Sequence, residues 1–558
     1  MSSNFIKKHL PVLLVGLSVI LGLIGFSIYF KNQNVSYSFT DLVYSVIRLF
    51  LMDSDFTLIN VNIFLNIARF LAPLSLATAV IQWLLKEFSN RIKLAQVKRL
   101  KNHIIVCGNA ASNKLLIQNL KEGKNHDYIA LQKEVSEEDS LPLNTIGYDQ
   151  VDTNLIKKTA FYKSRYLIIS FENDAESLSF ANKLLDTLNF NSIEQDIDII
   201  LLFKNPKWAE VSNDLGMMES INSKVRTHKH LNVRYLDYID KSIRKYMLNY
   251  APDTVKPVTK NSNPALATVV LGSGIVKERL IINLALNSHY INHKKLIVYV
   301  EKDSSQAFAS FLKEYQINEM IAIRETEPEE IVSKANVAAV YICENNELKI
   351  MQYIKALQRS RHQHGTKRFI FINHANNIAS LLPDEQNKII DISNEVGVFS
   401  NIIDESLDAM AKTIHNDYLA KLREASKLQP NKETHQEWNL LPDEMKDRNR
   451  MQADHIGIKI RSLSCHLMPL DSPTKAYDWK NDPRQEALSK AEHNRWNAYM
   501  YYKGWKFGKD KNEQRKTHPD MISYDNLDDS IKQYDRNAIL NIPDLLEQAG
   551  YKIVSNSN

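Results

Sequence analysis

The first hundred residues hold two long apolar segments separated by a shorter amphipathic one. Residues 10–30 are uncharged and mostly aliphatic, and at about 1.5 Å per residue a helix of this length crosses the hydrocarbon core of a bilayer. A second apolar segment, 63–85, contains a single charge, Arg69, near one end, where a long side chain can reach the interface. We therefore predict membrane-spanning helices over residues 9–31 and 62–87.

The alternative for the first segment is a cleaved signal peptide, for which residues 25–27 offer a weak small-x-small site. The apolar run is longer than a usual signal core, and the second segment follows closely, which favours a hairpin of two spans. Basic residues flank this hairpin at Lys7, Lys8, Lys86, Arg91, Lys93, Lys98, Arg99 and Lys101. The positive-inside rule then places both termini in the cytoplasm, and we expect a multi-pass protein of the inner membrane.

The segment between the two spans has the layout of a pore loop. Residues 38–52 could form a helix that is too short to cross, and the polar Asp53, Ser54 and Asp55 follow it. A re-entrant segment over 36–61 between two spans resembles the pore of two-span potassium channels. The sequence LFLMDSD stands where those channels carry TVGYGD, so the filter glycines are missing and the resemblance leaves the ion selectivity open. Rings of carboxylates would favour cations; the alternative is an extracellular loop with two solvated acids.

From residue 103 the pattern changes to alternating strands and helices, which is typical of a parallel, doubly wound sheet. After the first strand, further strands are predicted at 127–131, 145–148, 166–170 and 196–203. The same order restarts at 267 after a polar stretch, with further strands at 296–300, 320–323, 338–342 and 368–372. We predict an internal duplication that gives two Rossmann-like domains, 102–255 and 265–403.

A dinucleotide site needs glycines between the first strand and helix, and an acid after the second strand. The first copy keeps one glycine of three, Gly108, and we expect it not to bind NAD in the usual manner. The second copy keeps two glycines but has Lys277 at the third position. Its nucleotide-binding candidates are Gly272, Ser273, Gly274 and Glu301. The alternative is a remnant of the fold that serves assembly.

The placement of these domains strengthens the channel interpretation. A Rossmann domain directly after an inner helix, followed by a second one, resembles the tandem RCK (TrkA-N-like) domains of ligand-gated potassium channels. Residues 162–185 are similar to that family's fourth strand and following helix. The resemblance implies a homotetramer in which the domains form a ring that pulls on the inner helices. Generic α/β domains are the alternative.

The remainder, 404–558, is predicted to be helical and internally repeated. Trp438, Leu441, Lys446, Asn449, Arg450, Ala453 and Ile456 match Tyr524, Leu527, Lys532, Asp535, Arg536, Ile539 and Ile542 at a constant offset of 86 residues. Upstream, residues 414–418 echo 492–496. Like positions at one spacing indicate a tandem duplication.

The second copy resembles the repeat domain of ryanodine receptors, the RyR domain. The resemblance rests on His493, Trp496, residues 504–508, His518, Pro519, Tyr524, Leu527 and residues 534–536. It implies an all-α tandem module that senses a small, nucleotide-like signal, including signals raised in antiviral defence. Candidate ligand-binding residues are Arg495, Trp496, Trp505, Arg515, Tyr524, Arg536, Trp438 and Arg450. Aromatic faces would stack on a base and arginines would bind phosphate; the alternative is core packing and ion pairs between helices.

Composition narrows the possible functions. Lys and Arg exceed Asp and Glu by only 5 in 558 residues, so no nucleic acid polymer is expected as partner. Three separate cysteines exclude a disulfide scaffold, and no metal-ligand spacing or catalytic motif is present. We expect no enzyme and no metal, and the cofactor stays undefined. The leading hypothesis is a ligand-gated, homotetrameric cation channel. A non-conducting membrane-anchored scaffold and a regulatory subunit of a potassium-uptake system are the alternatives.

Overall fold

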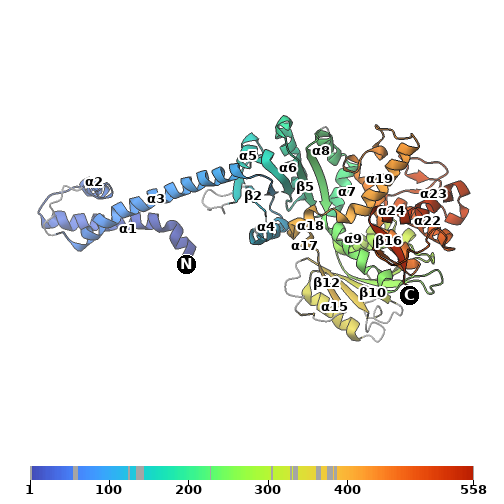
Figure 1. Cartoon of the computed structure of the whole chain (residues 1–558). Helices are drawn as coiled ribbons and strands as arrows, with labels where there is room; N and C mark the ends of the chain where they lie inside the picture. Colours follow the sequence, from blue (N-terminus) through green and yellow to red (C-terminus); the bar gives the residue numbers. More distant parts are fainter. Residues whose placement is uncertain are drawn as a thin grey trace. The chain divides into compact units, whose positions relative to one another are not determined.

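The chain forms two compact units, the first mainly of residues up to Leu100 and the second of most residues from Lys101 onward (Figure 1). The computed structural model describes residues 3–53, 61–123, 126–133, 144–226, 228–302, 306–326, 330, 337–359, 366–373, 381–382 and 386–556.

The first unit is a helical hairpin. Helices α1 (Ser3–Asn32) and α3 (Ile63–Arg99) pack side by side, and α2 (Phe39–Phe50) lies against both. The close approach depends on Gly25, because a Cβ there would lie 2.6 Å from the backbone nitrogen of Leu65. Asn62 caps α3 and donates its side-chain amide to the Gly25 carbonyl at 2.8 Å.

The outer surface of this hairpin is apolar. Two stretches are long and apolar enough to cross a membrane, Val12–Asn32 and Ile63–Ile81, with mean hydropathies of 2.4 and 1.7. Large apolar side chains on both helices are exposed; Phe70 is 73% exposed and Val12 is 71% exposed. Apolar surface of this extent needs a cover, and lipid would provide it. The two apolar helices fit the predicted two-span arrangement.

The first α/β domain has a six-stranded sheet of order β3-β2-β1-β4-β5-β6. Its strands are β1 (His103–Cys107), β2 (Tyr128–Lys133), β3 (Thr145–Tyr148), β4 (Ser164–Ile169), β5 (Ile197–Phe203) and β6 (Leu231–Asp237). Its helices are α4 (Ala111–Gly123), α5 (Thr153–Lys158), α6 (Asp174–Thr187), α7 (Pro206–Asp214), α8 (Met217–Val225), α9 (Tyr238–Tyr250) and α10 (Pro252–Val255). This is the strand order of a Rossmann fold.

The second α/β domain repeats this order, read from the other edge, as β12-β11-β10-β7-β8-β9. Its strands are β7 (Ala267–Gly272), β8 (Ile297–Glu301), β9 (Ala322–Thr326), β10 (Val337–Cys343), β11 (Lys367–Ile372) and β12 (Asn387–Asp391). Its helices are α11 (Ile275–Asn287), α12 (Gln306–Glu314), α13 (Ile317–Met320), α15 (Glu347–Arg359), α17 (Asn394–Gly397) and α18 (Phe399–Ile403). The predicted pair of doubly wound domains is confirmed. The last strand of each sheet was not predicted, because β6 and β12 are edge strands that are mostly only half-buried.

The two domains exchange helices. From the first domain, α9 places Ile239, Ile243 and Met247 in the core of the second. In return, α17 and α18 at the end of the second domain pack on the first, where Asn119 donates to the Gly397 carbonyl at 2.7 Å. Each domain therefore contributes to the hydrophobic core of the other, and the two domains form one compact unit.

The C-terminal module is mainly helical. Its helices are α19 (Ala409–Glu424), α20 (Asp443–Asp454), α21 (Ile456–Ser462), α22 (Gln485–Tyr502), α23 (Asp529–Leu540) and α24 (Ile542–Gln548). Two small sheets add to them: antiparallel β13 (Cys465–Pro469) with β16 (Tyr551–Ser555), and parallel β14 (Lys506–Phe507) with β15 (Thr517–His518). Neither small sheet was predicted.

Equivalent hydrogen bonds relate the two halves of this module. His415 on α19 bonds through Nε2 to the Gln436 carbonyl at 2.7 Å, and His493 on α22 bonds to the Ile522 carbonyl at 2.9 Å. Each histidine thus ties its helix to the loop before the next helix. The shared bond supports the tandem duplication read from the sequence, and it gives both histidines a structural role.

Candidate functional site

The glycine turn of the second α/β domain lies at the junction of β7 and β10. Gly272 has a φ of +96°, and a Cβ there would lie 2.1 Å from the Cys343 carbonyl oxygen. Gly274, with a φ of +81°, directly precedes α11. Only glycine fits such a close approach at positive φ. The strand order reverses at this point, where doubly wound sheets bind ligands.

Carboxylates, however, already bond to the donors of this turn. Glu301 accepts from the Tyr353 hydroxyl at 2.5 Å and from the Gly272 N–H at 3.4 Å. Burial raises the pKa of Tyr353, which keeps it a donor. Ser273 donates through Oγ to Glu344 at 3.4 Å. Gly272, Ser273, Gly274 and Glu301 lie together, and a ligand phosphate would compete with these carboxylates; nucleotide binding here stays a prediction.

In the first domain a carboxylate of the protein itself, that of Glu172, lies at the glycine turn. Gly108 makes the same close approach, since a Cβ there would lie 1.9 Å from the Ser170 carbonyl oxygen. At the start of α4 the Ala111 N–H donates to Glu172 at 3.2 Å, and Lys204 holds the same carboxylate at 2.7 Å. The hydrogen bond from Lys204 lowers the pKa of Glu172. A phosphate at the start of α4 would compete with Glu172; that the first copy does not bind NAD in the usual manner stays a prediction.

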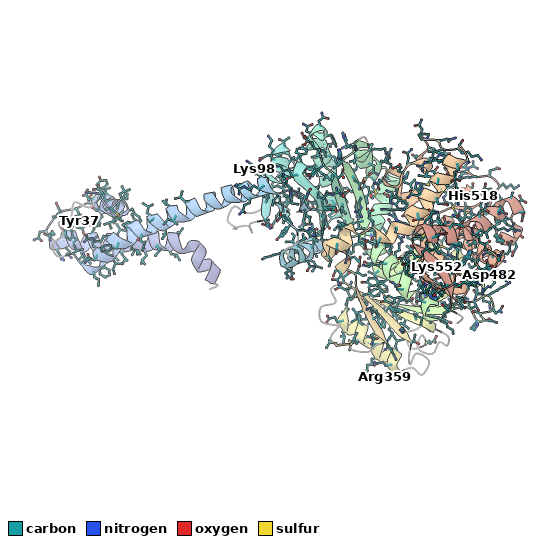
Figure 2. The ribbon with its side chains drawn as sticks, in the orientation of Figure 1. Tyr37, Lys98, Arg359, Asp482, His518 and Lys552 are labelled. Carbon is teal, nitrogen blue, oxygen red and sulfur yellow. The ribbon has the colours of Figure 1, made fainter. Side chains whose placement is uncertain are left out.

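The predicted aromatic residues of the second RyR-like copy gather into one cluster. Trp496 stacks on His493 with ring centroids 5.5 Å apart and meets the edge of His518 at 5.1 Å. Trp505 lies 6.2 Å from His518, and Tyr524 lies 6.0 Å from His493. Figure 2 marks His518 on this module. Trp505 and Tyr524 are buried whereas Trp496 is half-buried, so Trp496 is the predicted ring best placed to meet a ligand.

The predicted arginines of this copy are mostly engaged in ion pairs. Arg495 is buried and donates to Glu492 at 2.7 and 3.0 Å, and Lys459 holds the same carboxylate at 2.5 Å. Arg536 donates twice to Glu486, each at 2.9 Å. The pairs Lys459–Glu492 and Arg536–Glu486 cross between helices, which matches the alternative of ion pairs between helices.

Arg515 differs from the other two arginines. It lies on the turn between β14 and β15 and is exposed. Of the three predicted phosphate donors in this copy it is the most exposed, so a phosphate could reach it without competing with Glu492 or Glu486.

The first copy carries a similar pair. Arg450 donates to Asp408 at 2.6 and 3.0 Å and to Asp447 at 3.0 Å, and its guanidinium lies 5.8 Å from the centre of the Trp438 ring. Arg244 from α9 reaches the same Asp408 at 2.5 Å. Two guanidinium groups lower the pKa of Asp408 against the effect of its burial. Trp438 and Arg450 are thus close together, but the arginine is committed to carboxylates.

Of the predicted pore residues, Asp53 is described and Ser54 and Asp55 lie outside the described residues. Asp53 directly follows α2 and its side chain is 64% exposed. Arg48 on α2 donates to the Asp53 carbonyl at 3.1 Å and to its carboxylate at 3.4 Å. This partner, missed in the sequence, offsets part of the negative charge of Asp53.

A polar junction between the domains was also missed. Glu210 on α7 accepts from Arg279 on α11 at 2.6 Å, from Tyr315 at 2.7 Å and from Tyr502 on α22 at 2.8 Å. Arg279 is only 1% exposed. Burial alone would raise the pKa of Glu210, but Arg279 and the two hydroxyls outweigh it and lower that pKa. One carboxylate therefore joins both α/β domains and the C-terminal module.

Across the described part of the chain, no group of three or more His, Cys, Asp or Glu side chains is placed to hold a metal ion. The three cysteines are buried and free. Burial raises the pKa of the Cys465 thiol to about 11, so this thiol is protonated at neutral pH.

Comparison with known proteins gives one family match and a set of distant structures. A search of curated proteins gives no match. The GsuK channel bound to NAD is 10% identical, with a TM-score of 0.34, over 87% of this chain and 90% of that one. GsuK bound to ADP is 11% identical, with a TM-score of 0.34, over 71% and 96%. The GsuK RCK domain is 9% identical, with a TM-score of 0.33, over 70% and 85%.

These TM-scores are low; the α/β fold rests on the strand order of the two sheets. The family model of the RyR domain matches residues 468–555. This range contains the second helical copy together with β14, β15 and β16, and the aromatic cluster lies inside it. The chain therefore carries an RyR domain at its C-terminal end.

Proposed function

We propose that the chain is the subunit of a ligand-gated, homotetrameric cation channel of the inner membrane, with both termini in the cytoplasm. The order of parts along the chain carries this proposal: two helices able to span, a pair of Rossmann-like domains and an RyR domain. Helix α3 ends at Arg99 and β1 begins at His103. Residues 100–102 thus connect a candidate inner helix directly to the first sheet, so movement of that sheet would act on the helix.

The RyR domain is the proposed sensor of a small, nucleotide-like ligand. Its helix α22 carries Tyr502, which bonds to Glu210 of the first α/β domain, and Glu210 bonds to Arg279 of the second. A ligand that prefers one arrangement of these parts shifts the population toward it. An opening that admits several cations would depolarise the membrane, which suits an antiviral defence effector. No catalytic step is part of this proposal.

One observation favours a second candidate, a membrane-anchored scaffold that conducts nothing. Asp53 is paired with Arg48, and a neutralised carboxylate attracts cations less than a free one. In that case the hairpin would only hold the ligand-binding unit at the membrane. A regulatory subunit of a potassium-uptake system would also have a hairpin that conducts no ions, and it would co-purify with a larger membrane partner.

Thermal unfolding of the full chain in detergent, with and without ADP, NAD and cyclic nucleotides, tests the sensor. A ligand that binds only the native state raises its stability by about 2.7 kcal/mol at 100 times its Kd. Trp496→Ala should reduce the shift if the RyR domain is the sensor. Tyr418→Ala, at the matching position of the first copy, is the control and should leave the shift unchanged. A shift that is undiminished in Trp496→Ala would contradict the assignment.

A further inference from the structure

A cavity of about 210 Å³ lies where three parts of the second unit meet. Its walls come from α9 and α10 of the first α/β domain, α11 of the second and α21 of the C-terminal module. The cavity is separate from the glycine turn and from the aromatic cluster. At about 30 Å³ for each water molecule it has room for about seven, which is the size class of a heterocyclic base.

Part of the lining of the cavity is apolar. Met247, Leu284 and Ile458 line it and are buried. Leu248 and Leu467 also line it and are about 39% and 41% exposed, which places them at its open side. Small-molecule sites combine such apolar walls with a few polar groups that fix orientation.

Two buried acceptors on the wall are unused. Asp253 is 2% exposed; its Oδ2 accepts from Arg461 at 2.7 Å, whereas its Oδ1 has no partner among the residues that the structure describes. Asn287 donates to the Asn283 carbonyl at 3.1 Å, and its Oδ1 likewise has no partner within the described residues. Unpaired buried acceptors are costly. Neither oxygen is accessible to water, so a ligand with N–H donors would satisfy both once the two side chains turn toward the cavity.

The cations on the wall differ in availability. Each of the three nitrogens of Arg244 already donates one hydrogen bond, to Asp454, Asp408 and the Leu407 carbonyl. Arg461 donates a hydrogen bond through Nε to Asp253, and its two Nη groups have no hydrogen-bond partner in the described parts of the chain. An anionic substituent on the ligand would therefore face Arg461.

We propose that this cavity binds a small aminated heterocycle, with its N–H groups bonded to Asp253 and Asn287 and its ring between Met247, Leu284 and Ile458. The source is either a free base or nucleoside, or the base of a nucleotide whose phosphate faces Arg461. The inference deepens the proposed function by adding a ligand site, although binding does not require ion conduction. Because the walls belong to three parts, an occupied cavity holds them in one arrangement.

Isothermal titration of the full chain in detergent tests this site. The probes are adenine, guanine and cytosine, each as base, nucleoside and monophosphate. At least one probe should bind, and Asp253→Asn should weaken its binding at least tenfold. Asn287→Leu, which removes the second acceptor at similar volume, should do the same. Asp529→Asn, which removes an exposed partner of Arg536 outside the cavity, is the control and should bind as the wild type.

Preference among the probes separates the two sources. Tighter binding of the monophosphate, lost in Arg461→Gln, identifies a nucleotide, whereas equal binding of base and monophosphate identifies a base or nucleoside. The proposal is overturned if no probe binds at millimolar concentration, or if binding is undiminished in both Asp253→Asn and Asn287→Leu. Neither overturning result bears on ion flux, so the channel proposal is tested separately.

Discussion

At the scale of single residues, several charged side chains of the RyR domain form ion pairs. Glu492 is buried between Arg495 and Lys459. Burial alone would raise its pKa, but the two cations outweigh this effect and lower the pKa from 4.5 to about 2. The carboxylate is therefore ionised at every physiological pH, and its removal leaves the two buried cations without this counter-charge.

We expect Glu492→Gln to lower the free energy of unfolding by about 3–5 kcal/mol, because it breaks a buried ion pair. Denaturant unfolding of the full chain in detergent at pH 7 measures this. Glu486→Gln is the matched control, since Glu486 is 57% exposed and pairs with Arg536; its cost should be about 0–1 kcal/mol. Equal losses in the two variants would contradict this account.

The effect of Glu492 should depend on pH. Its pKa is lower in the folded chain, so its stabilising contribution is complete above about pH 4.5 and is lost as the pH falls toward about 2. The difference between wild type and Glu492→Gln should therefore be constant from pH 8 to 6 and shrink below about pH 4.5. A difference that grows on acidification would contradict the sign.

The sequence predicted which residues cluster but not which of them are free. Trp496, Trp505 and Tyr524, three of the predicted ligand-binding residues, come together around His493 and His518. The role of Arg495 could have been doubted from Glu492, which lies one helical turn before it. The partner of Arg536, Glu486, comes from another helix, and spacing along one segment cannot show such a pair.

At the scale of elements, periodicity predicted the interior strands well and the edges poorly. Strands buried on both faces, such as β5 with the sequence IDIILLF, give long apolar runs. By contrast, β12 has the sequence NKIID and is only partly buried. The strand β13 pairs with β16 far along the chain, and such pairing leaves no local signal.

The membrane hairpin depends on one close contact between elements. We expect Gly25→Leu to destabilise it by about 1–3 kcal/mol or more, because the side chain would overlap the backbone of Leu65. Gly16→Leu is the control, since no atom lies within 4 Å of a Cβ built there. Thermal unfolding of the full chain in detergent, followed by size-exclusion chromatography, measures the loss. A similar loss in both variants would contradict the packing.

At the scale of the second unit, exchanged helices and the Glu210 junction join what the sequence presents as separate domains. Internal repeats revealed the two sheets, but α9, α17 and α18 cross between them. The hydrophobic pattern of a helix does not indicate which domain core the helix packs into. The domains are thus predictable from sequence, whereas their coupling is not.

We expect Glu210→Gln to loosen helices of two other parts, α11 and α22, because it leaves Arg279 buried without a full counter-charge. Hydrogen–deuterium exchange of the full chain should show faster exchange in both helices. The control is Glu219→Gln, whose exposed pair with Arg226 should matter little. Faster exchange confined to α7 would contradict the coupling.

The central claim is ligand-gated conduction, and cation flux from liposomes containing the full chain tests it most directly. We predict flux only after addition of a compound that binds the protein, and reduced flux in Asp53→Asn. Asp149→Asn, an exposed acid of the second unit, should conduct as the wild type. If a compound binds tightly and the liposomes stay sealed, or if flux needs no ligand, the account is contradicted and the scaffold takes its place.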